Sequence, residues 1–475
     1  MADVGAERLS EIALNQVELP YHADSTPLFS QIRGMPYAAF LDSGQHGSDL
    51  GRFDILCADP SHLLVSAGQQ TLLSLPNGQR SRLDTLPFET LQALLIEQGF
   101  DGVAAPDLPF CGGALGYFGY DLGRRYESFE NMARQDIDLP EMQVGIYTWA
   151  IVVDHLKRRT RLVSRTLTSQ ALHQLLDRFT PLEPEAFLLT SAFGSNLCRD
   201  AYKERFDRII DYIQAGDCYQ VNLAQRFSCT YQGDPWRAYL QLRARTRTPF
   251  SAFLAFPEGC LLSLSPERFL QVDKGAVQTR PIKGTRCRHA DPDKDLQRKV
   301  ALQNSAKDRA ENLMIVDLLR NDLGRSCTIG SVKVSKLFDI ESYVNVHHLV
   351  TTITGQLQQP VDVVRLLQGC FPGGSITGAP KIRAMQIIEQ LEPHRRSLYC
   401  GSIGYIGFNG RMDTNICIRT LVATRNQAGS SQVDGNNMYC WAGGGVVADS
   451  ICEDEYQETF DKVNNLISAL ETCFL

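Results

Sequence analysis

The alternation of apolar and polar residues predicts strands through the first 190 residues of the chain. Residues 52–56 and residues 145–153 are rich in β-branched and aromatic side chains and follow glycine turns. Residues 180–185 contain two prolines and two glutamates without helical or strand periodicity, which is typical of a linker. We therefore expect a strand-rich N-terminal region that ends near residue 190.

A helical repeat begins after this linker. Apolar side chains recur at helical spacing at Tyr202, Phe206, Ile209, Ile210 and Ile213. Asp200 can cap the start of this helix, and Gly216 can end it. Residues 219–223 then alternate as a strand does, and residues 456–470 predict an amphipathic helix at the end of the chain. Strands and helices mixed without regular alternation predict an α+β fold.

Length and composition limit the class of protein. At 475 residues the chain exceeds what one hydrophobic core usually supports, so we expect two domains or one large one, with regions at 1–190 and 195–475. No apolar run approaches the roughly 20 residues of a membrane helix. The N-terminus lacks a secretory signal, so we expect a cytoplasmic protein without a membrane partner. The 14 cysteines are scattered singly, which favours free thiols over disulfides or zinc ligands.

The charge balance is acidic. A net charge of −7 and a pI near 5.8 argue against a nucleic-acid partner, which normally requires a basic surface. An anionic substrate would therefore have to be held by local positive groups.

Two pairs of acidic residues have a spacing that suits a metal site. Asp308 and Glu311 are three residues apart in a predicted helix, and Glu455 and Glu458 repeat this spacing in the last helix. The members of each pair therefore lie on one helical face. Ligand sets made only of oxygen favour Mg²⁺ over zinc. A solvated helix face, with a basic residue beside each pair, is the alternative that spacing alone leaves open.

Lys283 lies between an apolar residue and a glycine in the tract 280–285. By itself this pattern is that of a surface lysine. A nucleophilic role requires a neutral amine, so its pKa would have to fall by about 3 pH units from about 10.4, at a cost of about 4 kcal/mol. Burial beside Mg²⁺ or Arg419 could supply that change.

The glycine-rich segment 373–381 lacks the spacing of a phosphate-binding loop, which makes a kinase function a weak alternative. Its backbone amides could receive a carboxylate, with Pro380 in the first turn of the following helix. A purely structural turn explains the glycines equally well.

Taken together, these segments resemble the chorismate-utilising enzymes. The resemblance is nearly continuous from about 195 to 470 and looser at residues 51–56 and 112–121. It rests on ordered motifs at residues 219–223, 265–269, 280–285, 310–322, 347–350, 373–381, 401–405, 418–420 and 455–459. It implies a four-layer α/β sandwich with two large, mostly antiparallel sheets flanked by helices, and an active site in the C-terminal half.

The resemblance also implies a Mg²⁺ site and a substrate site. The implied direct metal ligands are Glu311 and Glu458, with Asp308 and Glu455 acting through water. The aspartate at 308 departs from the glutamate of some relatives. The residues implied to hold chorismate are Ser375, His348, Tyr405, Arg419, Lys462 and the backbone at Gly445.

Two positions indicate that the nucleophile is ammonia rather than water. Relatives that use water carry a lysine where this chain has Gln220, and the anthranilate branch generally carries alanine where this chain has Lys283. The resemblance implies that Lys283 adds to carbon 2 of chorismate as the 4-hydroxyl leaves, with Glu267 as general acid and His348 assisting. Ammonia then displaces the lysine and gives 4-amino-4-deoxychorismate, a precursor of 4-aminobenzoate and folate.

The chain lacks the Gly-x-Cys-x-Gly signature of a glutaminase. The resemblance therefore implies a separate glutamine amidotransferase subunit that supplies ammonia. It also implies a tryptophan pocket, for feedback or for a structural ligand, near Ser43, Pro249, Phe250 and Ser251. The alternative functions are the large subunit of an anthranilate-forming enzyme and a catalytically idle tryptophan-binding subunit.

Overall fold

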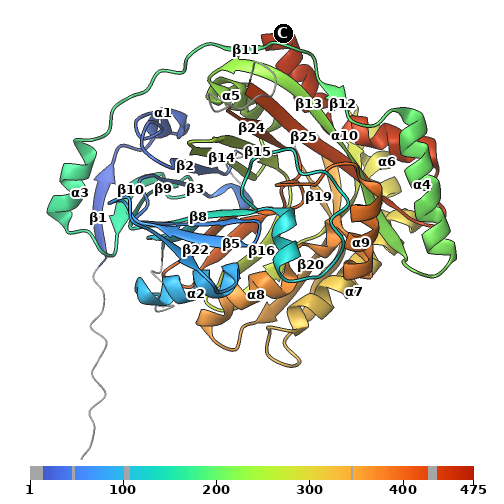
Figure 1. The fold of residues 1–475 in the computed structure, drawn as a ribbon, viewed down its shortest axis with the longest axis horizontal. Coiled ribbons are helices and arrows are strands. Elements are labelled where there is room, and N and C mark those ends of the chain that lie inside the picture. Colours follow the sequence, from blue (N-terminus) through green and yellow to red (C-terminus); the bar gives the residue numbers. More distant parts are fainter. Residues whose placement is uncertain (1–13, 45–48, 101–106, 344–345, 426–435) are drawn as a thin grey trace, which may run out of the picture.

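In the computed structural model, two large antiparallel sheets form the centre of the molecule, and helices cover their outer faces (Figure 1). The structure describes residues 14–44, 49–100, 107–343, 346–425 and 436–475. Within these residues every pairing between the named strands is antiparallel, as in the pairing of β13 with β25, where Asn222 lies opposite Gly445.

The first sheet contains 13 strands. In spatial order they are β1 (Asn15–Leu19), β10 (Arg159–Ser164), β9 (Trp149–Asp154), β3 (Phe53–Cys57), β2 (Ala39–Asp42), β14 (Phe250–Phe256), β15 (Gly259–Ser265), β24 (Thr420–Thr424), β25 (Asn436–Val446), β13 (Gln220–Gly233) and β11 (Phe187–Leu189), with β12 (Gly194–Ser195) and β21 (Gly378–Ala379) also paired to β13.

The second sheet contains 12 strands. In spatial order they are β18 (Ile282–Cys287), β20 (Val346–Gln356), β17 (Ala276–Thr279), β16 (Arg268–Asp273), β23 (Met412–Asn415), β22 (Ser402–Gly407), β7 (Gly113–Phe118), β8 (Met142–Tyr147), β4 (His62–Ala67), β5 (Gln70–Ser74) and β6 (Arg80–Leu83), with β19 (Lys333–Ser342) also paired to β20.

The helices form the two outer layers. They are α1 (Thr26–Ser30), α2 (Pro87–Glu97), α3 (Ser169–Leu176), α4 (Arg199–Gln214), α5 (Pro235–Thr246), α6 (Pro292–Gln303), α7 (Ala306–Gly324), α8 (Val363–Cys370), α9 (Lys381–Leu391) and α10 (Cys452–Phe474). Apolar side chains of α5 and α10, such as Trp236 and Val463, pack with Phe253 and Leu262 of the first sheet. Those of α2, α7 and α8 pack in the core that also contains the residues between the two sheets. The predicted α+β fold with two large antiparallel sheets is therefore confirmed.

Both sheets combine strands from the two halves of the chain. In the first sheet β2 pairs with β14, and in the second sheet β7 pairs with β22. Strands from residues 1–190 and from residues 195–475 therefore share both sheets. Of the two expected arrangements this sharing fits one large domain, because a strand cannot leave a sheet without exposing its neighbour's backbone groups, and the division near residue 190 stays a prediction.

Most predicted elements lie where the apolar pattern places them. The strand at 52–56 is β3, the repeat from Tyr202 to Ile213 is α4, and the terminal amphipathic helix is α10. The helix α4 begins two residues earlier than expected, because Cys198 rather than Asp200 is its N-cap. The run 145–153 is not one strand: β8 belongs to the second sheet and β9 to the first, with Thr148 between them.

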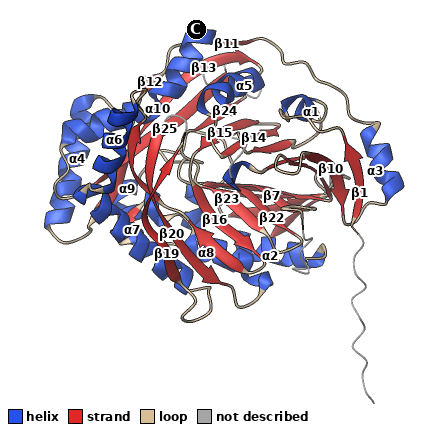
Figure 2. Cartoon of the chain, turned by 180° about the vertical axis from the view of Figure 1, so that it is seen from behind, coloured by secondary structure: helices blue, strands red, loops and turns tan. Residues whose placement is uncertain are grey.

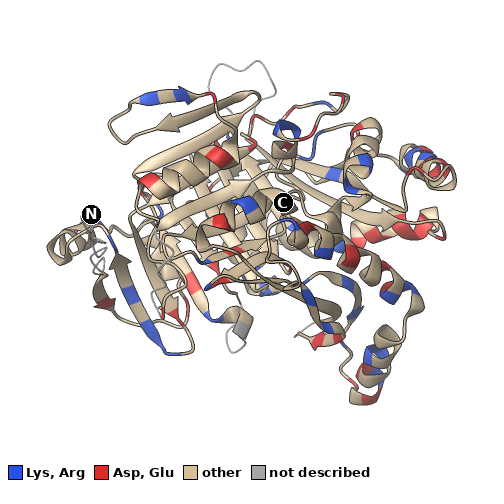
Figure 3. Ribbon diagram, turned by 90° about the horizontal axis from the view of Figure 1, so that it is seen from below, with Lys and Arg blue, Asp and Glu red and all other residues tan. Residues whose placement is uncertain are grey.

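The catalytic candidates gather at one end of the molecule. Helices α4, α6, α7 and α9 lie together at this end, where β13 and β20 also lie, as two opposite views show (Figures 1 and 2). Strand β18 pairs with β20. Acidic and basic residues are interspersed along the elements (Figure 3). Local groups at this end must therefore hold any anionic substrate.

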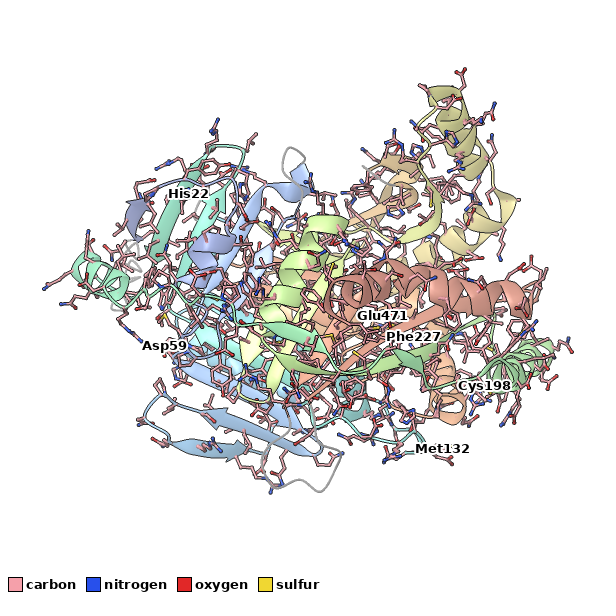
Figure 4. All side chains as sticks on the ribbon, turned by 90° about the horizontal axis from the view of Figure 1, so that it is seen from above. His22, Asp59, Met132, Cys198, Phe227 and Glu471 are labelled. Atoms are coloured by element: carbon pink, nitrogen blue, oxygen red, sulfur yellow. The ribbon has the colours of Figure 1, made fainter. Side chains whose placement is uncertain are left out.

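All 14 cysteines are free thiols, as expected. Eleven are buried or partly buried, and three are exposed, among them Cys198 at the start of α4 on the periphery of the molecule (Figure 4). None of the helices among the described residues is both long and apolar enough to cross a membrane.

Candidate active site

Lys283 is presented by an irregularity in β18. The pairing of β18 with β20 shifts register between Ile282 and Thr285, so Lys283 and Gly284 form a bulge. Gly284 has a φ of +83°, and a Cβ at this position would lie 2.8 Å from the carboxyl carbon of Asp308. Only glycine adopts this conformation at low cost in so small a space. The bulge therefore turns Lys283 out of the ladder and brings β18 against the start of α7.

Ser375 connects Lys283 with Glu267. The Nζ of Lys283 lies 3.4 Å from the carbonyl oxygen of Ser375, and the hydroxyl of Ser375 donates to Oε1 of Glu267 over 3.3 Å. Glu267 lies between β15 and β16 and is only 6% exposed. The structure thus brings together the three residues that the sequence assigns to nucleophile, acid and substrate binding.

The protein environment disfavours the charged forms of both groups. Burial raises the pKa of Glu267 to about 7, although Lys283 and the Ser375 hydroxyl oppose the rise. Burial lowers the pKa of Lys283, although Glu311 opposes the fall and Lys462 adds to it. A carboxyl group that keeps its proton near neutral pH can donate it, and an amine that loses its proton can attack.

His348 is a neutral imidazole beside a cation. Burial lowers its pKa to about 4, and the neighbouring Arg419 lowers it further. Its Nδ1 lies 2.8 Å from the hydroxyl of Thr285, across the register pair that joins β18 to β20. The Arg419 guanidinium has no hydrogen bond or ion pair to the part of the chain that the structure describes. The neutral imidazole of His348 and the guanidinium of Arg419, which has no partner among the described residues, therefore lie near each other.

The two acidic pairs lie at the starts of α7 and α10. Lys307 of α7 approaches Glu455 of α10 to 3.9 Å, which places the two helix starts side by side. Like-charge neighbours and burial raise the pKa of Glu311, and burial raises the pKa of Glu455. Burial opposes ionisation of Glu458 as well, but nearby lysines outweigh it and lower that pKa.

The chemistry of these donors suits Mg²⁺. They offer only carboxylate oxygens, and the pKa of Glu311 is raised, mainly by burial and to a smaller extent by Asp308 and Glu458, while Lys283 and Lys307 oppose the rise. Three of the four contact a protein cation instead: Arg286 at 3.0 Å from Asp308, Lys307 near Glu455, and Lys462 at 2.6 Å from Glu458. Among the described residues, no three acidic, histidine or cysteine side chains are close enough to form a metal site.

A run of glycines in β25 lets side chains approach its backbone. A Cβ on Gly444 would meet the Glu455 carboxylate at 2.5 Å, and one on Gly445 would meet the Gln220 amide. Gln220 is 1% exposed, and its Oε1 has no hydrogen bond within the described residues. Lys462 donates to the carbonyl of Gly443 over 2.7 Å. This strand therefore carries the backbone that the sequence assigns to carboxylate binding.

A cavity of about 360 Å³, called the second cavity below, is lined by the residues of the expected tryptophan pocket. Its lining includes Ser43, Pro249, Phe250 and Ser251. Tyr405 also lines this cavity and packs against Phe110, with ring centroids 5.4 Å apart. Tyr405 therefore lies with the residues of the expected tryptophan pocket, and its expected contact with the chorismate side chain stays a prediction.

The register of β22 places Tyr405 at this cavity. Tyr405 pairs with Asp413 of β23 and Leu115 of β7, which turns its ring toward the second cavity. Arg268 is not predicted from the sequence; it lines the same cavity and donates two hydrogen bonds, of 2.9 and 2.8 Å, to Asp413. Arg268 lies within the tract 265–269, but only the pairing of β16 with β23 reveals its place.

A family model described as chorismate binding enzyme matches residues 37–468. The chain belongs to this family. It is 51% identical over 444 residues to aminodeoxychorismate synthase component 1 of Escherichia coli (strain K12), covering 93% of this chain and 95% of the relative. It is 32% identical to anthranilate synthase component 1 of Acetivibrio thermocellus over 96% of this chain and 95% of that one.

The structure of anthranilate synthase component I from Streptococcus pneumoniae TIGR4 is similar to this chorismate-binding enzyme, with a TM-score of 0.74 and 31% identity. The similarity covers 95% of this chain and 99% of that chain. The expected fold family is thus confirmed, and the aminodeoxychorismate synthase component 1 of Escherichia coli, at 51% identity, is more similar in sequence than the anthranilate synthase component 1 of Acetivibrio thermocellus, at 32%.

Proposed function

We propose that this chain aminates chorismate with ammonia to give 4-amino-4-deoxychorismate, through a covalent bond to Lys283. The observation that carries the proposal is the connection, through Ser375, of a partly buried lysine whose pKa is lowered with a buried Glu267 whose pKa is raised to about 7. A lowered lysine pKa and a raised glutamate pKa both come from burial, so solvent-exposed side chains would not show them.

In the first step the neutral Lys283 amine forms a bond to carbon 2 of chorismate, both ring double bonds shift, from carbons 1–2 and 5–6 to carbons 1–6 and 4–5, and the bond from carbon 4 to its hydroxyl breaks. Glu267 donates the proton that lets the hydroxyl leave as water, and it becomes a carboxylate. The neutral His348 holds the departing hydroxyl by a hydrogen bond.

In the second step ammonia forms a bond to carbon 4, both ring double bonds shift back, and the bond from carbon 2 to Lys283 breaks. The lysine leaves as a neutral amine, and the new ammonium group returns one proton to Glu267. Chorismate and ammonia thereby become 4-amino-4-deoxychorismate and water, and the enzyme regains its starting state. The orphaned Oε1 of Gln220 can accept a hydrogen bond from ammonia.

The anionic substrate requires cations at two places. Arg419 and Lys462, with the backbone around Gly445, would hold the carboxylate of the enolpyruvyl side chain. Glu311 and Glu458, with Asp308 and Glu455 around them, would hold Mg²⁺, which on binding supplies a Lewis acid that fixes the ring carboxylate and withdraws electrons from the ring. Ser375 would donate to the same ring carboxylate.

We also propose that a separate glutamine amidotransferase subunit supplies the ammonia and that tryptophan occupies the second cavity. The name component 1 of the relatives supports a partner subunit. Free thiols throughout support a reducing compartment, so we place the protein in the cytoplasm.

Product analysis tests the function. The purified chain with chorismate, Mg²⁺ and ammonium should yield 4-amino-4-deoxychorismate, which an added lyase converts to 4-aminobenzoate. Anthranilate as the main product would instead support the anthranilate synthase alternative. Tight tryptophan binding without any turnover would support the idle subunit.

The covalent step has its own test. Lys283→Ala should lower kcat by more than about 100-fold, which corresponds to about 2.7 kcal/mol. Mass spectrometry of the quenched parent enzyme should show a chorismate-derived adduct on the peptide that contains Lys283. Lys333→Ala, at an exposed position of β19, is the matched control and should keep both the rate and the adduct. The same lysine adduct persisting in Lys283→Ala would disprove this nucleophile.

A further inference from the structure

Arg396 and Glu392 form a buried ion pair beside the proposed active site. Their side chains are 1% and 5% exposed, and hydrogen bonds of 2.9 and 2.6 Å join the guanidinium to the carboxylate. The rings of Tyr120 and Tyr399 lie 4.9 and 5.6 Å from the guanidinium carbon. Buried ion pairs add little net stability, because desolvation offsets their attraction. The further contacts of this pair therefore decide what it does.

The pair completes an edge of β13. The short strand β21 covers this edge only at the first two residues of β13. Beyond them, the Nη2 of Arg396 donates to the carbonyl of Asn222 over 2.7 Å, and Glu392 accepts from the amide of Ala224 over 2.9 Å. The ion pair thus takes the place of a strand partner.

The same guanidinium reaches the loop that carries Ser375. Its Nη1 donates to the carbonyl of Ile376 over 3.0 Å, and the side-chain amide of Asn222 donates to the same carbonyl over 2.9 Å. Ile376 follows Ser375 directly in the chain. One planar group therefore joins β13 to the residue next to Ser375, which contacts both the proposed nucleophile and the proposed acid.

We propose that Arg396, oriented by Glu392, is a positioning residue that fixes the carbonyl and hydroxyl of Ser375 against Lys283 and Glu267. The inference rests on the proposed function of those two residues. It requires the fork of arginine, because a lysine ammonium can keep its charge beside Glu392 but cannot donate to the carboxylate and to both carbonyls in the same geometry.

Arg396→Lys in the full chain tests the proposal, with chorismate, Mg²⁺ and ammonium as substrates and activator. We expect kcat to fall by about 10-fold to 100-fold, because displacements of about 1 Å have effects of this size. The chorismate KM should change by less than about threefold. In Arg396→Lys the Ser375 hydroxyl should move away from Glu267, so the Glu267 carboxylate loses a hydrogen-bond donor that stabilises it. The pKa of Glu267 should therefore rise, and the fall of kcat at high pH should move to higher pH.

A double variant keeps the test independent of folding. Arg396→Met with Glu392→Leu removes both charges and leaves neither unpaired, so we expect a folded protein with the same loss of kcat. If this variant does not fold, Arg396→Lys alone decides the question. A folded Arg396→Lys enzyme with the kcat and pH profile of the parent would overturn the proposal.

The matched control is another buried arginine pair on β13. Arg226 binds Asp136 through hydrogen bonds of 2.6 and 2.8 Å, and within the described residues it makes no hydrogen bond to residues 373–379. Arg226→Met with Asp136→Leu should keep kcat within about twofold of the parent. An equal loss of kcat in the control would show that any buried pair matters and would refute a positioning role. A parent chain without turnover would instead reject the proposed function.

Discussion

Replacing Glu267 by glutamine should make the protein more stable at alkaline pH while removing its activity. The pKa of Glu267 is raised from its ordinary 4.5 to about 7, mainly because the side chain is buried. A folded protein that holds a proton more tightly than its unfolded chain is destabilised once the pH removes that proton. The destabilisation begins near pH 4.5, is complete above pH 7, and reaches roughly 3.4 kcal/mol.

The magnitude between two accessible pH values follows from these two pKa values. Ionisation of Glu267 costs roughly 1.4 kcal/mol at pH 5.5 and roughly 3.4 kcal/mol at pH 8.5. The free energy of unfolding of Glu267→Gln, relative to the parent, should therefore rise by about 2 kcal/mol between these pH values. Glutamine keeps the shape and a hydrogen bond to Ser375 but has no charge to bury.

Urea unfolding at both pH values measures this difference. Glu204→Gln, on the exposed face of α4, is the control because it buries no carboxylate, and its difference from the parent should not depend on pH. The kcat of Glu267→Gln should fall by about 100-fold or more, since the amide cannot act as the general acid. A stability difference that stays constant from pH 5.5 to pH 8.5 would refute the raised pKa and, with it, the assignment of Glu267 as an acid near neutral pH.

Three further changes test other parts of the site. Arg419→Gln should raise the chorismate KM by about 10-fold or more in steady-state kinetics, because it removes a buried cation without a protein partner; an unchanged KM would place the substrate elsewhere. Glu311→Gln should raise the Mg²⁺ concentration for half-maximal activity by about 10-fold or more, and equal Mg²⁺ titrations of variant and parent would contradict its role as a ligand. Gly284→Ala should lower the free energy of unfolding by about 1–3 kcal/mol, since φ is +83° and the new Cβ would press on Asp308; a parent-like urea midpoint would show that the bulge can relax.

The sequence predicts helices and strands well where the apolar pattern alone determines the element. The apolar repeat of α4 and the terminal helix α10 have a single face to bury, and both occur where the pattern places them. The run 145–153 is apolar throughout, so alternation could not show that Thr148 separates two strands of different sheets. That division depends on which sheet each half pairs with, which is a property of distant residues.

The residues of the site likewise fall into those that local sequence patterns predict and those that they do not. The tract around Lys283 and the spacing of the acidic pairs are local and could be found in the sequence. The place of Tyr405 could not, because a tyrosine in a strand faces one of two sides, and the pairing of β22 with β7 and β23 selects the second cavity. Arg396 gave no signal either, since its four hydrogen bonds join segments more than 150 residues apart, from Asn222 to Ile376.

Several departures from local preference lie at the proposed active site, and they come from segments far apart in the chain. Gly284 has a φ of +83°, Arg419 has a φ of +50°, and Gly378 has a φ of +141° directly against the carbonyl of Gln220. The buried Oε1 of Gln220 has no partner among the described residues, and the pKa of the partly buried Lys283 is lowered. The unpartnered oxygen and the desolvated amine cost free energy in the folded chain, and a ligand that donates to the oxygen or brings negative charge beside the amine would offset that cost. Ligands should therefore stabilise this end of the protein more than any other, and amide hydrogen exchange with and without chorismate and Mg²⁺ should show the largest protection in β18, β25 and the start of α10. Protection confined to the second cavity would contradict this reasoning.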